Sequence, residues 1–345
     1  MTTMPTTKSS VANQVPTLWS TRLLAQAENK TFWHRFEGAE GSGMPIVRKD
    51  DLTKAAGDTI KTDLVLALAG AGVTGDANAL HGNEEQLKFN QLSFSVSDLS
   101  HAVGWTELAA QLITHNMRKT ALNQLTKWLA GKLDDSVWSE LTGGGTTVPT
   151  VNEWYAGTAT SVNTLADSDT AGRLKLNDIS DVKAYAQSTL KIEPLRIENG
   201  EEYFGLVLDP FALLALKKDT NYQQALREGQ QRSATNPLFT GNAGMWDGVI
   251  LYANNRVPSA TNTNTPAIRY AKNVFFGAQA LMRGFAQYPD WREEQFDYGR
   301  QSGVATTMIK GQKLAVYDLS SAQDGSGNQA IGSVVVNTAA VAPVA

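Results

Sequence analysis

The stretch that decides the fold runs from residue 106 to residue 141, T-E-L-A-A-Q-L-I-T-H-N-M-R-K-T-A-L-N-Q-L-T-K-W-L-A-G-K-L-D-D-S-V-W-S-E-L. It contains no proline, and a continuous helix of this length would be roughly 50 Å long. Thr106 is suited to cap its N-terminus, and Glu107 places negative charge at the positive end of the helix dipole. Three glycines at 143–145 cannot sustain a helix, so we expect it to end there.

The apolar residues of this stretch form two rows. One row contains Ile113, Met117, Ala121 and Leu125, and the other contains Leu122, Leu129, Leu133, Val137 and Leu141. An ordinary surface helix has one apolar face. Two rows therefore indicate either a helix with protein on both sides or a core helix inside one large domain. Gly131 costs about 1 kcal/mol relative to alanine in a helix, and the cap-like residues 134–136 follow it, which allows a kink or a restart there.

Length and composition narrow the class of protein. The chain has 345 residues, enough for two or three domains, and a formal net charge of −4, which gives no general attraction for nucleic acid. It has no cysteine, which excludes disulfides and thiolate metal sites. The first ten residues lack the apolar core of a secretory signal, and no apolar run reaches the ~18–20 residues of a membrane span. We expect the chain to stay in a cytoplasm-like compartment.

Residues 1–36 are predicted to form an arm with a mobile start and one short helix from Thr17. Its charge is mainly positive, since only Glu28 opposes the four basic residues Lys8, Arg22, Lys30 and Arg35. This excess indicates either a solvated face or contact with a negatively charged partner, which would be another subunit or nucleic acid.

Residues 37–104 show strand-like alternation without helical periodicity, so we expect an extended, mostly β element that projects outward. Strands are predicted around residues 64–69 and 87–96. The alternation changes phase at Asn90 and Gln91, which predicts a bulge or a bend.

A glycine-rich stretch in this element, from Gly70 to Gly75, matches the dinucleotide-binding pattern G-x-G-x-x-G. That chemistry needs a helix to begin at the glycines, so that its N-terminus meets the pyrophosphate. Residues 76–83 are typical of a turn instead. We therefore expect a glycine-rich turn and no cofactor, and a nucleotide-binding oxidoreductase remains the alternative.

The same stretch begins a set of four motifs in a fixed order. They are G-A-G-V-T-G-D…L-H-G-N-E-E-Q-L-K-F at 70–89, N-P-L-F-T-G at 236–241 with G-V at 248–249, F-F-G-A-Q-A at 275–280, and W-R-E-E-Q-F-D-Y-G…G-V-A at 291–305. Together they cover roughly residues 57–316 and resemble the major capsid proteins of tailed phages, of the short-tailed-phage type.

This resemblance implies an α+β fold of the Hong Kong 97-like class, with the long helix as the spine helix of a peripheral (P) domain. It divides the chain into an N-terminal arm (1–36), an extended β loop or E-loop (37–104), a P domain with the spine helix (105–178), an axial (A) domain (179–270), the end of the A domain with returning P-domain strands (271–318) and a C-terminal tail (319–345).

The A domain has its own local signals. Ile179, Val182, Ala186 and Leu190 have helical spacing behind the cap residues Asn177 and Asp178. Residues 203–208 are typical of a buried strand, and Asp209-Pro210 is predicted to open the next helix. The preceding connection, 142–178, is expected to be either functional or poorly ordered.

No catalytic pattern is present. The four histidines lack metal-ligand spacing, and there is no G-x-S-x-G elbow or Walker sequence. The adjacent acidic pairs at 84–85, 134–135 and 293–294 point in different directions, so they are interpreted as solvated or intersubunit charges. Lys54 and Lys61 are available for an isopeptide crosslink, but the motifs do not imply that reaction. We expect no enzyme, no metal and no cofactor.

The function implied by the resemblance is that of a major capsid protein, which self-assembles into hexamers and pentamers and forms the icosahedral head of a tailed double-stranded DNA phage. The implied partners are further copies of the chain, a portal, a scaffold and packaged DNA without sequence-specific contacts, and no membrane. The implied location is the virion, after assembly in the host bacterial cytoplasm. A cellular nanocompartment shell of the same fold is a second alternative. Charged candidates for intersubunit contacts are Arg22, Arg35, Lys54, Lys61, Asp76, Glu84 and Glu85.

Overall fold

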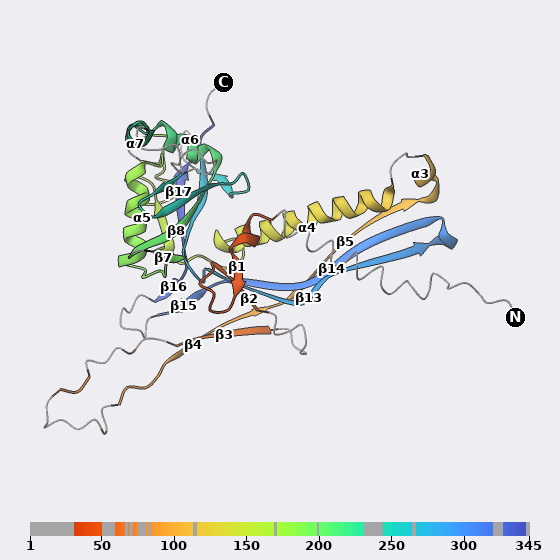
Figure 1. Cartoon of the computed structure of the whole chain (residues 1–345), viewed down its shortest axis with the longest axis horizontal. Helices are drawn as coiled ribbons and strands as arrows, with labels where there is room; N and C mark the ends of the chain where they lie inside the picture. Colours follow the sequence, from red (N-terminus) through yellow and green to blue (C-terminus); the bar gives the residue numbers. More distant parts are fainter. Residues whose placement is uncertain are drawn as a thin grey trace.

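A computed structural model describes residues 31–49, 59–65, 68, 72–74, 81, 84–112, 116–168, 171–198, 200–230, 244–263, 267–319 and 327–342. The molecule is elongated: a five-stranded sheet beside a long helix extends away from an eight-stranded sheet with its helices, and a hairpin projects from below (Figure 1). Strands and helices are segregated, as predicted for an α+β fold.

The five-stranded sheet has the order β1-β2-β13-β14-β5. Its strands are β1 (Glu37–Ala39), β2 (Ile46–Lys49), β5 (Ser97–Thr106), β13 (Leu281–Phe296) and β14 (Gln301–Leu314). β13 and β14 form a long antiparallel hairpin, and β5 pairs with β14 from Ser97 opposite Lys310 to Thr106 opposite Gln301. β1, β2 and most of β5 come from the predicted extended element, so this part of it belongs to the sheet.

The predicted continuous helix from 106 to 141 is wrong, because the chain forms two helices, α3 (Glu107–Leu112) and α4 (Met117–Leu141). Asn116 has an extended backbone, and its Oδ1 accepts the backbone N–H of Lys119 at 3.1 Å, so it caps α4. The cap predicted at Thr106 is confirmed for α3, since its Oγ1 accepts the N–H of Ala109 at 3.2 Å.

Gly131 produces no break in α4. Its missing side chain instead makes room for Arg256, whose Nη2 lies 3.2 Å from where a Cβ would stand. Arg256 Nη1 donates to the Gly131 carbonyl at 3.0 Å and to Asp135 Oδ1 at 2.8 Å.

The two apolar rows of α4 do not face protein on two opposite sides. Buried residues occur as adjacent pairs every four residues, from Ala121 and Leu122 to Val137 and Trp138. A four-residue step exceeds one helical turn by about 40°, so the buried band winds around the helix axis. Its first half packs on Trp291 and other side chains of the five-stranded sheet, and its last turns enter the core between the two sheets.

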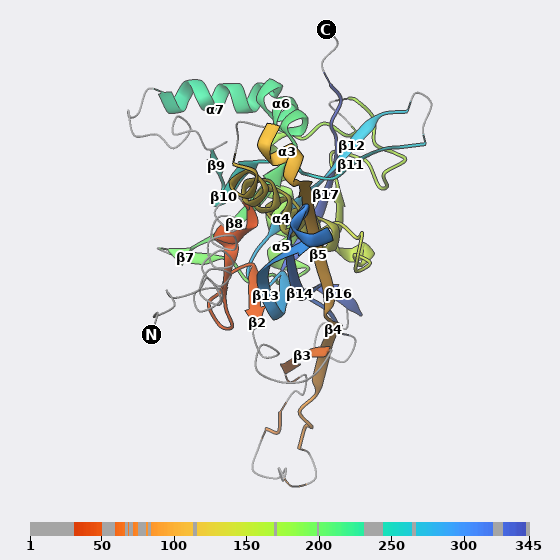
Figure 2. The same cartoon turned by 90° about the vertical axis from the view of Figure 1, so that its right-hand side faces the viewer.

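The eight-stranded sheet has the order β6-β17-β12-β8-β10-β9, with β7 and β11 paired at β8 and β12. Its strands are β6 (Glu153–Tyr155), β7 (Arg196–Glu198), β8 (Glu201–Leu208), β9 (Met245–Trp246), β10 (Val249–Ala253), β11 (Ser259–Thr261), β12 (Arg269–Phe276) and β17 (Ser333–Ala339). The associated helices are α5 (Leu176–Ser188), α6 (Pro210–Lys218) and α7 (Thr220–Gln230). Figure 2 shows α7 extending away from this sheet.

The helix, the strand and the helix start predicted between residues 177 and 210 are confirmed, with one shift. α5 buries Ile179, Val182 and Ala186, and Asp209 caps α6 by accepting the N–H of Phe211 at 2.9 Å. The cap of α5 was expected at Asn177 and Asp178, but the helix begins at Leu176. Asp178 lies inside the first turn, where its side chain accepts the N–H of Lys175 at 2.8 Å.

The connection 142–178 is built into the body. It contains the 3₁₀ turn η3 (Thr150–Asn152) and β6, the edge strand beside β17. The fully buried Asn152 donates to the carbonyls of Ala330 and Ser333 and accepts the N–H of Ala330, each at 2.9 Å. This side chain holds the end of β16 (Asn328–Ala330), which pairs with β15 (Val316–Asp318), beside the start of β17. The C-terminal region thus supplies a fully buried interior strand, β17.

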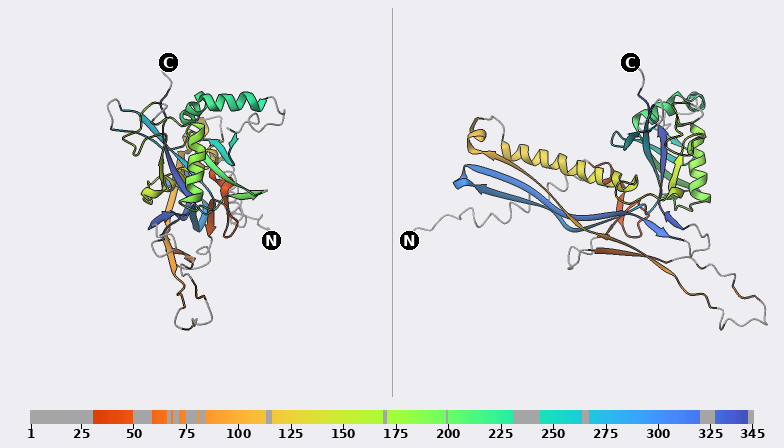
Figure 3. Two further views of the ribbon diagram at one scale, coloured as in Figure 1. Left: turned by 90° about the vertical axis from the view of Figure 1, so that its left-hand side faces the viewer. Right: turned by 180° about the vertical axis from the view of Figure 1, so that it is seen from behind.

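The projecting element is the hairpin of β3 (Thr59–Val65) and β4 (Phe89–Ser95). Its register runs without a shift from Thr59 opposite Ser95 to Val65 opposite Phe89, so the bulge predicted at residues 90–91 is wrong. The apparent change of phase arises because Leu92 and Phe94 face the body while Phe89 lies on the exposed face. Figure 3 shows this hairpin on the side of the five-stranded sheet opposite α4.

Candidate assembly surfaces

The hairpin β3–β4 has two different apolar faces. Ile60, Leu92 and Phe94 are buried at its base, in a cluster with side chains of the body that include Met282 and Tyr317. Farther along the hairpin, large apolar side chains are exposed: Val65 56%, Leu68 56%, Leu87 60% and Phe89 66%. We name these four residues the hairpin row. Isolated exposed apolar residues are ordinary, but a row on a projecting element is typical of a contact surface.

The five-stranded sheet has one covered and one open face. Val304, Thr306 and Met308 of β14 are buried under α4, so the alternate residues of β14 face the other way. These residues pair with small residues of β5: Gly303 with Gly104, Ala305 with Ala102, and Thr307 with Ser100. We name these three pairs the small-residue face. It lies on the side from which the hairpin projects (Figure 1).

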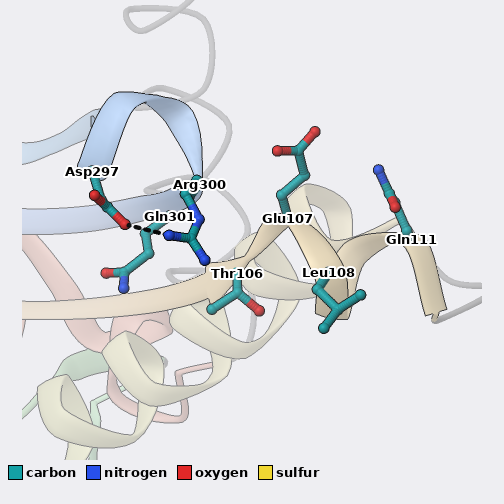
Figure 4. Close-up of a pocket in the computed structure, with 7 residues that line it drawn as sticks. All are labelled: Thr106, Glu107, Leu108, Gln111, Asp297, Arg300 and Gln301. Carbon is teal, nitrogen blue, oxygen red and sulfur yellow. Dashed lines mark ion pairs between the residues drawn. The ribbon is translucent and has the colours of Figure 1, made fainter.

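A third surface lies at the far end of the sheet, which we name the tip. Here the turn between β13 and β14 meets the start of α3, and a cavity of about 320 Å³ is lined by Thr106, Glu107, Leu108, Gln111, Asp297, Arg300 and Gln301 (Figure 4). The N–H of Glu107 donates to the Arg300 carbonyl at 2.8 Å, and Arg300 Nη1 lies 3.7 Å from Asp297 Oδ2. Around this turn Leu108, Leu112, Phe296 and Tyr298 are exposed.

The backbone of the tip is strained. Asp297, Tyr298 and Gly299 have φ values of 51°, 54° and 89°. A left-handed conformation costs a non-glycine residue roughly 1–2 kcal/mol, and Tyr298 nonetheless adopts it with its ring fully exposed. Backbone strain that presents an exposed aromatic ring is typical of a functional site.

A buried network joins the start of the described chain to α4. Asp134 accepts the backbone N–H groups of Phe32 at 3.0 Å and Trp33 at 3.3 Å. Burial outweighs these hydrogen bonds and raises the pKa of the Asp134 carboxyl. Trp33 is completely buried, and its ring meets that of Trp138 edge-on at 5.0 Å.

Two buried cations lie in the same region. Arg283 forms an ion pair with Glu37, and Lys310 Nζ donates to Ser136 Oγ at 2.5 Å. Burial, together with the charge of Arg283, lowers the pKa of Lys310 to about 7. This network ties β1, α4, β13 and β14 together.

Of the seven charged candidates, Arg22, Lys54 and Asp76 lie outside the described residues. Arg35 is exposed, but it packs over the rings of Phe32 at 4.3 Å and Tyr252 at 5.6 Å within its own chain. Lys61, Glu84 and Glu85 are exposed on the hairpin. The hairpin row and Tyr298 were not predicted from the sequence. For Phe89 a signal was present, because it is an apolar residue on the otherwise polar side of an alternating strand.

The acidic pairs behave in part as predicted. The members of the pair at 134–135 point in different directions, but Asp134 is buried and hydrogen-bonded rather than solvated. Glu293 pairs with Arg118 at 2.7 Å. Within the described ranges, no group of three potential metal ligands occurs. No described helix is both long and apolar enough to cross a membrane.

Comparisons with known proteins agree with this architecture. Residues 6–342 match a family model described as phage capsid protein, a match that includes Gly70 to Gly75. The major capsid protein of Pseudomonas phage KPP25 is 30% identical over 344 residues, covering 87% of this chain and 89% of that protein.

Among solved structures, the capsid of Ralstonia phage GP4 has a TM-score of 0.75 at 22% identity, over 91% of this chain and 92% of that chain. The cyanophage Pam1 capsid has a TM-score of 0.76 at 20% identity, over 91% and 93% of the two chains. These structures show the predicted Hong Kong 97-like fold. The chain therefore belongs to the phage capsid protein family, as a major capsid protein of a bacteriophage.

Proposed function

We propose that this chain is the repeating subunit of an icosahedral head, arranged as hexamers and pentamers, and that its role is structural without catalysis. The observation that carries this proposal is the hairpin row. Val65, Leu68, Leu87 and Phe89 contribute nothing to the core of their own subunit, and burial against a second copy would contribute about 25 cal/mol for each Å² removed from water.

The small-residue face is the best-matched surface for this row. Gly104 and Gly303 carry no side chains, so another strand can approach the backbone closely there. The hairpin and this face lie on the same side of the sheet (Figure 1), so a hairpin that reaches a neighbour meets the open face and not α4. Such a contact joins two different surfaces of neighbouring copies. Repeated contacts of this kind form a closed ring when the rotation from one copy to the next returns to the first copy.

The other surfaces have supporting roles in this proposal. The arm (1–36) would extend contacts from its anchor at Trp33, and the tip would meet further copies through Tyr298 and Leu112. Residues 37–104 would act as the E-loop, with β3–β4 as its projecting part. Residues 105–178 would form the P domain, 179–270 the A domain, 271–318 the returning segment, and 319–345 the C-terminal region.

The charged candidates are proposed as secondary contacts. Lys61, Glu84 and Glu85 are exposed near the hairpin row, and Arg22, Lys54 and Asp76 are proposed from the sequence alone. Arg35 stays in this set because its side chain is exposed, although it packs on rings of its own chain. Further proposed partners are a portal, a scaffold and packaged double-stranded DNA, with assembly in the bacterial cytoplasm before the head becomes part of the virion.

The test replaces residues 70–82 with a short Gly/Ser bridge. Loop-closure entropy varies slowly with length, so the subunit should still fold and melt near the wild-type temperature by circular dichroism. Sedimentation velocity should show closed shells for the intact chain and only small species for the shortened chain. Closed shells of normal size from the shortened chain would contradict the proposed role of the hairpin.

A further inference from the structure

The exposed side of α4 carries only positive charges from Met117 to Leu133, before the exposed Asp135. From Met117 to Leu133 the helix contains Arg118, Lys119, Lys127 and Lys132 and no acidic residue. Arg118 is paired with Glu293, whereas the three lysines are exposed and take part in no ion pair among the described residues. This local excess stands against a whole-chain net charge of −4.

The three lysines are held on a fixed base. Leu122, Leu125 and Leu129 are buried beneath them against the five-stranded sheet. At 1.5 Å per residue, Lys119 and Lys132 are about 20 Å apart along the helix axis. Each residue turns the helix by about 100°, so Lys127 and Lys132 lie about 80° and 220° around the axis from Lys119 and follow the exposed side as it winds. A duplex carries one phosphate charge per about 1.7 Å of its axis, so roughly a dozen phosphates lie along the same length of about 20 Å.

The chemistry of this face favours a polyanion over a protein partner. None of the exposed large apolar residues of the described chain lies on α4; they lie on the hairpin, at the tip, on the A domain and, as Met44, between β1 and β2. Protein contacts depend on buried apolar or aromatic anchors, whereas contact with a phosphate backbone requires only positioned cations. α4 also lies on the side of the sheet opposite the hairpin (Figure 3), so the lysines are not on the side of the proposed subunit contacts.

We infer that the exposed face of α4, through Lys119, Lys127 and Lys132, is the surface that contacts the phosphate backbone of double-stranded DNA inside the shell. This inference rests on the proposed shell, because a closed shell gives the subunit an inner face. It orients the subunit, with α4 inward and the hairpin outward, and it makes the contact independent of base sequence.

The first test measures lysine acetylation by mass spectrometry in DNA-filled particles and in the same particles after DNA release. Lys119, Lys127 and Lys132 should react several-fold more slowly in filled particles, while the exposed Lys217 and Lys218 of α6 should react equally in both. Equal rates for the α4 lysines would overturn the inference. Protection that is greater before DNA entry than after it would assign the face to an acidic protein and would also overturn it.

The second test measures how salt affects binding of the unassembled full-length chain to short duplex DNA. Each phosphate contact contributes about 0.9 to the slope of log K against log salt, so Lys127→Gln/Lys132→Gln should reduce that slope by about 1.8. The matched variant Lys217→Gln/Lys218→Gln removes the same charge and should leave the slope unchanged. Equal slopes for the two variants would overturn the inference. If the wild-type chain still formed closed shells, the proposed function would not be affected. Failure of the wild-type chain to form shells would instead overturn the proposed function, and the inference with it.

Discussion

The side chain of Asp134 accepts the backbone N–H of Trp33 at 3.3 Å, although 101 residues separate them. The same carboxylate accepts the N–H of Phe32, and the Trp33 ring is completely buried beside Trp138. One buried acid in the second half of α4 therefore holds the point where the described chain begins. The first described residues, 31–33, are therefore fixed to α4.

Replacing this acid should loosen that anchor. Asp134→Ala leaves two backbone N–H groups without their acceptor, which costs about 1–3 kcal/mol each when they stay buried. We expect a lower free energy of unfolding in urea and faster proteolysis near residues 31–37. Asp135→Ala is the control, since Asp135 is exposed and pairs only at the surface, so its effect should stay below about 1 kcal/mol. Equal stability of the two variants would argue against the anchor.

Lys310 gives the folded protein a pH-dependent stability. Its pKa is about 7 in the folded chain and 10.5 in the unfolded one. Between these values the unfolded state binds more protons, so the free energy of unfolding should rise with pH, by about 3–5 kcal/mol over the whole window. Lys310→Met should remove this rise and make the protein more stable than wild type at about pH 6.

Urea denaturation between about pH 6 and pH 9.5 checks this prediction. Higher pH is avoided because burial raises the pKa of Tyr317 from 10.0 to about 12, so that this group lowers stability once the unfolded tyrosine ionises. Lys313→Met is the control on the same strand, since Lys313 Nζ bonds the Ser93 carbonyl at an exposed site. A rise with pH that persists in Lys310→Met would show that another group causes it.

Substitutions of two phenylalanines of β4 should distinguish an effect on folding from an effect on assembly. Phe94 is 6% exposed in the hairpin base and Phe89 is 66% exposed in the hairpin row. Phe94→Asp buries an unpaired charge and should unfold the hairpin base or lower the melting temperature strongly. Phe89→Asp should keep the wild-type melting temperature and prevent closed shells in sedimentation velocity. Assembly of Phe89→Asp at the wild-type concentration would remove Phe89 from the interface.

At the tip, one substitution should preserve or raise the stability of the subunit and weaken assembly. Tyr298→Gly relieves a left-handed tyrosine, so the free energy of unfolding should stay equal or rise by up to about 1 kcal/mol. If the exposed ring contacts a neighbour, the same variant should assemble only at a higher protein concentration. Tyr298→Asn, which tolerates this conformation, is the control and should assemble as poorly. Normal assembly of both would leave the strained turn without a role between subunits.

Capping residues and apolar spacing in the sequence correctly predicted the helices whose start or buried face depends on neighbouring residues. Asp209-Pro210 opened a helix as expected, and Ile179, Val182 and Ala186 are buried on one face of α5. The end of helical structure at Asn116 was not predicted, because one capping residue within a stretch of helix-forming residues gives a weak sequence signal. In the structure, its side chain caps α4. Tertiary context explains the remainder: β17 is buried because it lies between β6 and β12, which no local pattern shows.

The assembly surfaces were predictable only in part. A projecting β element was expected from alternation, but the predicted bulge was wrong because two apolar faces of one strand resemble a change of phase. The charged candidates came from residue type alone, whereas exposure of Phe89 and the conformation of Tyr298 depend on backbone geometry.

The most direct test of the account is a reconstruction of shells assembled from the purified chain, at a resolution that shows side chains. The account predicts closed shells in which Val65, Leu68, Leu87 and Phe89 of one subunit lie on the small-residue face of the next, over Gly104 and Gly303. It also predicts α4 on the inner surface. A shell in which the hairpin packs on its own subunit, or in which the hairpin row stays in solvent, would contradict it.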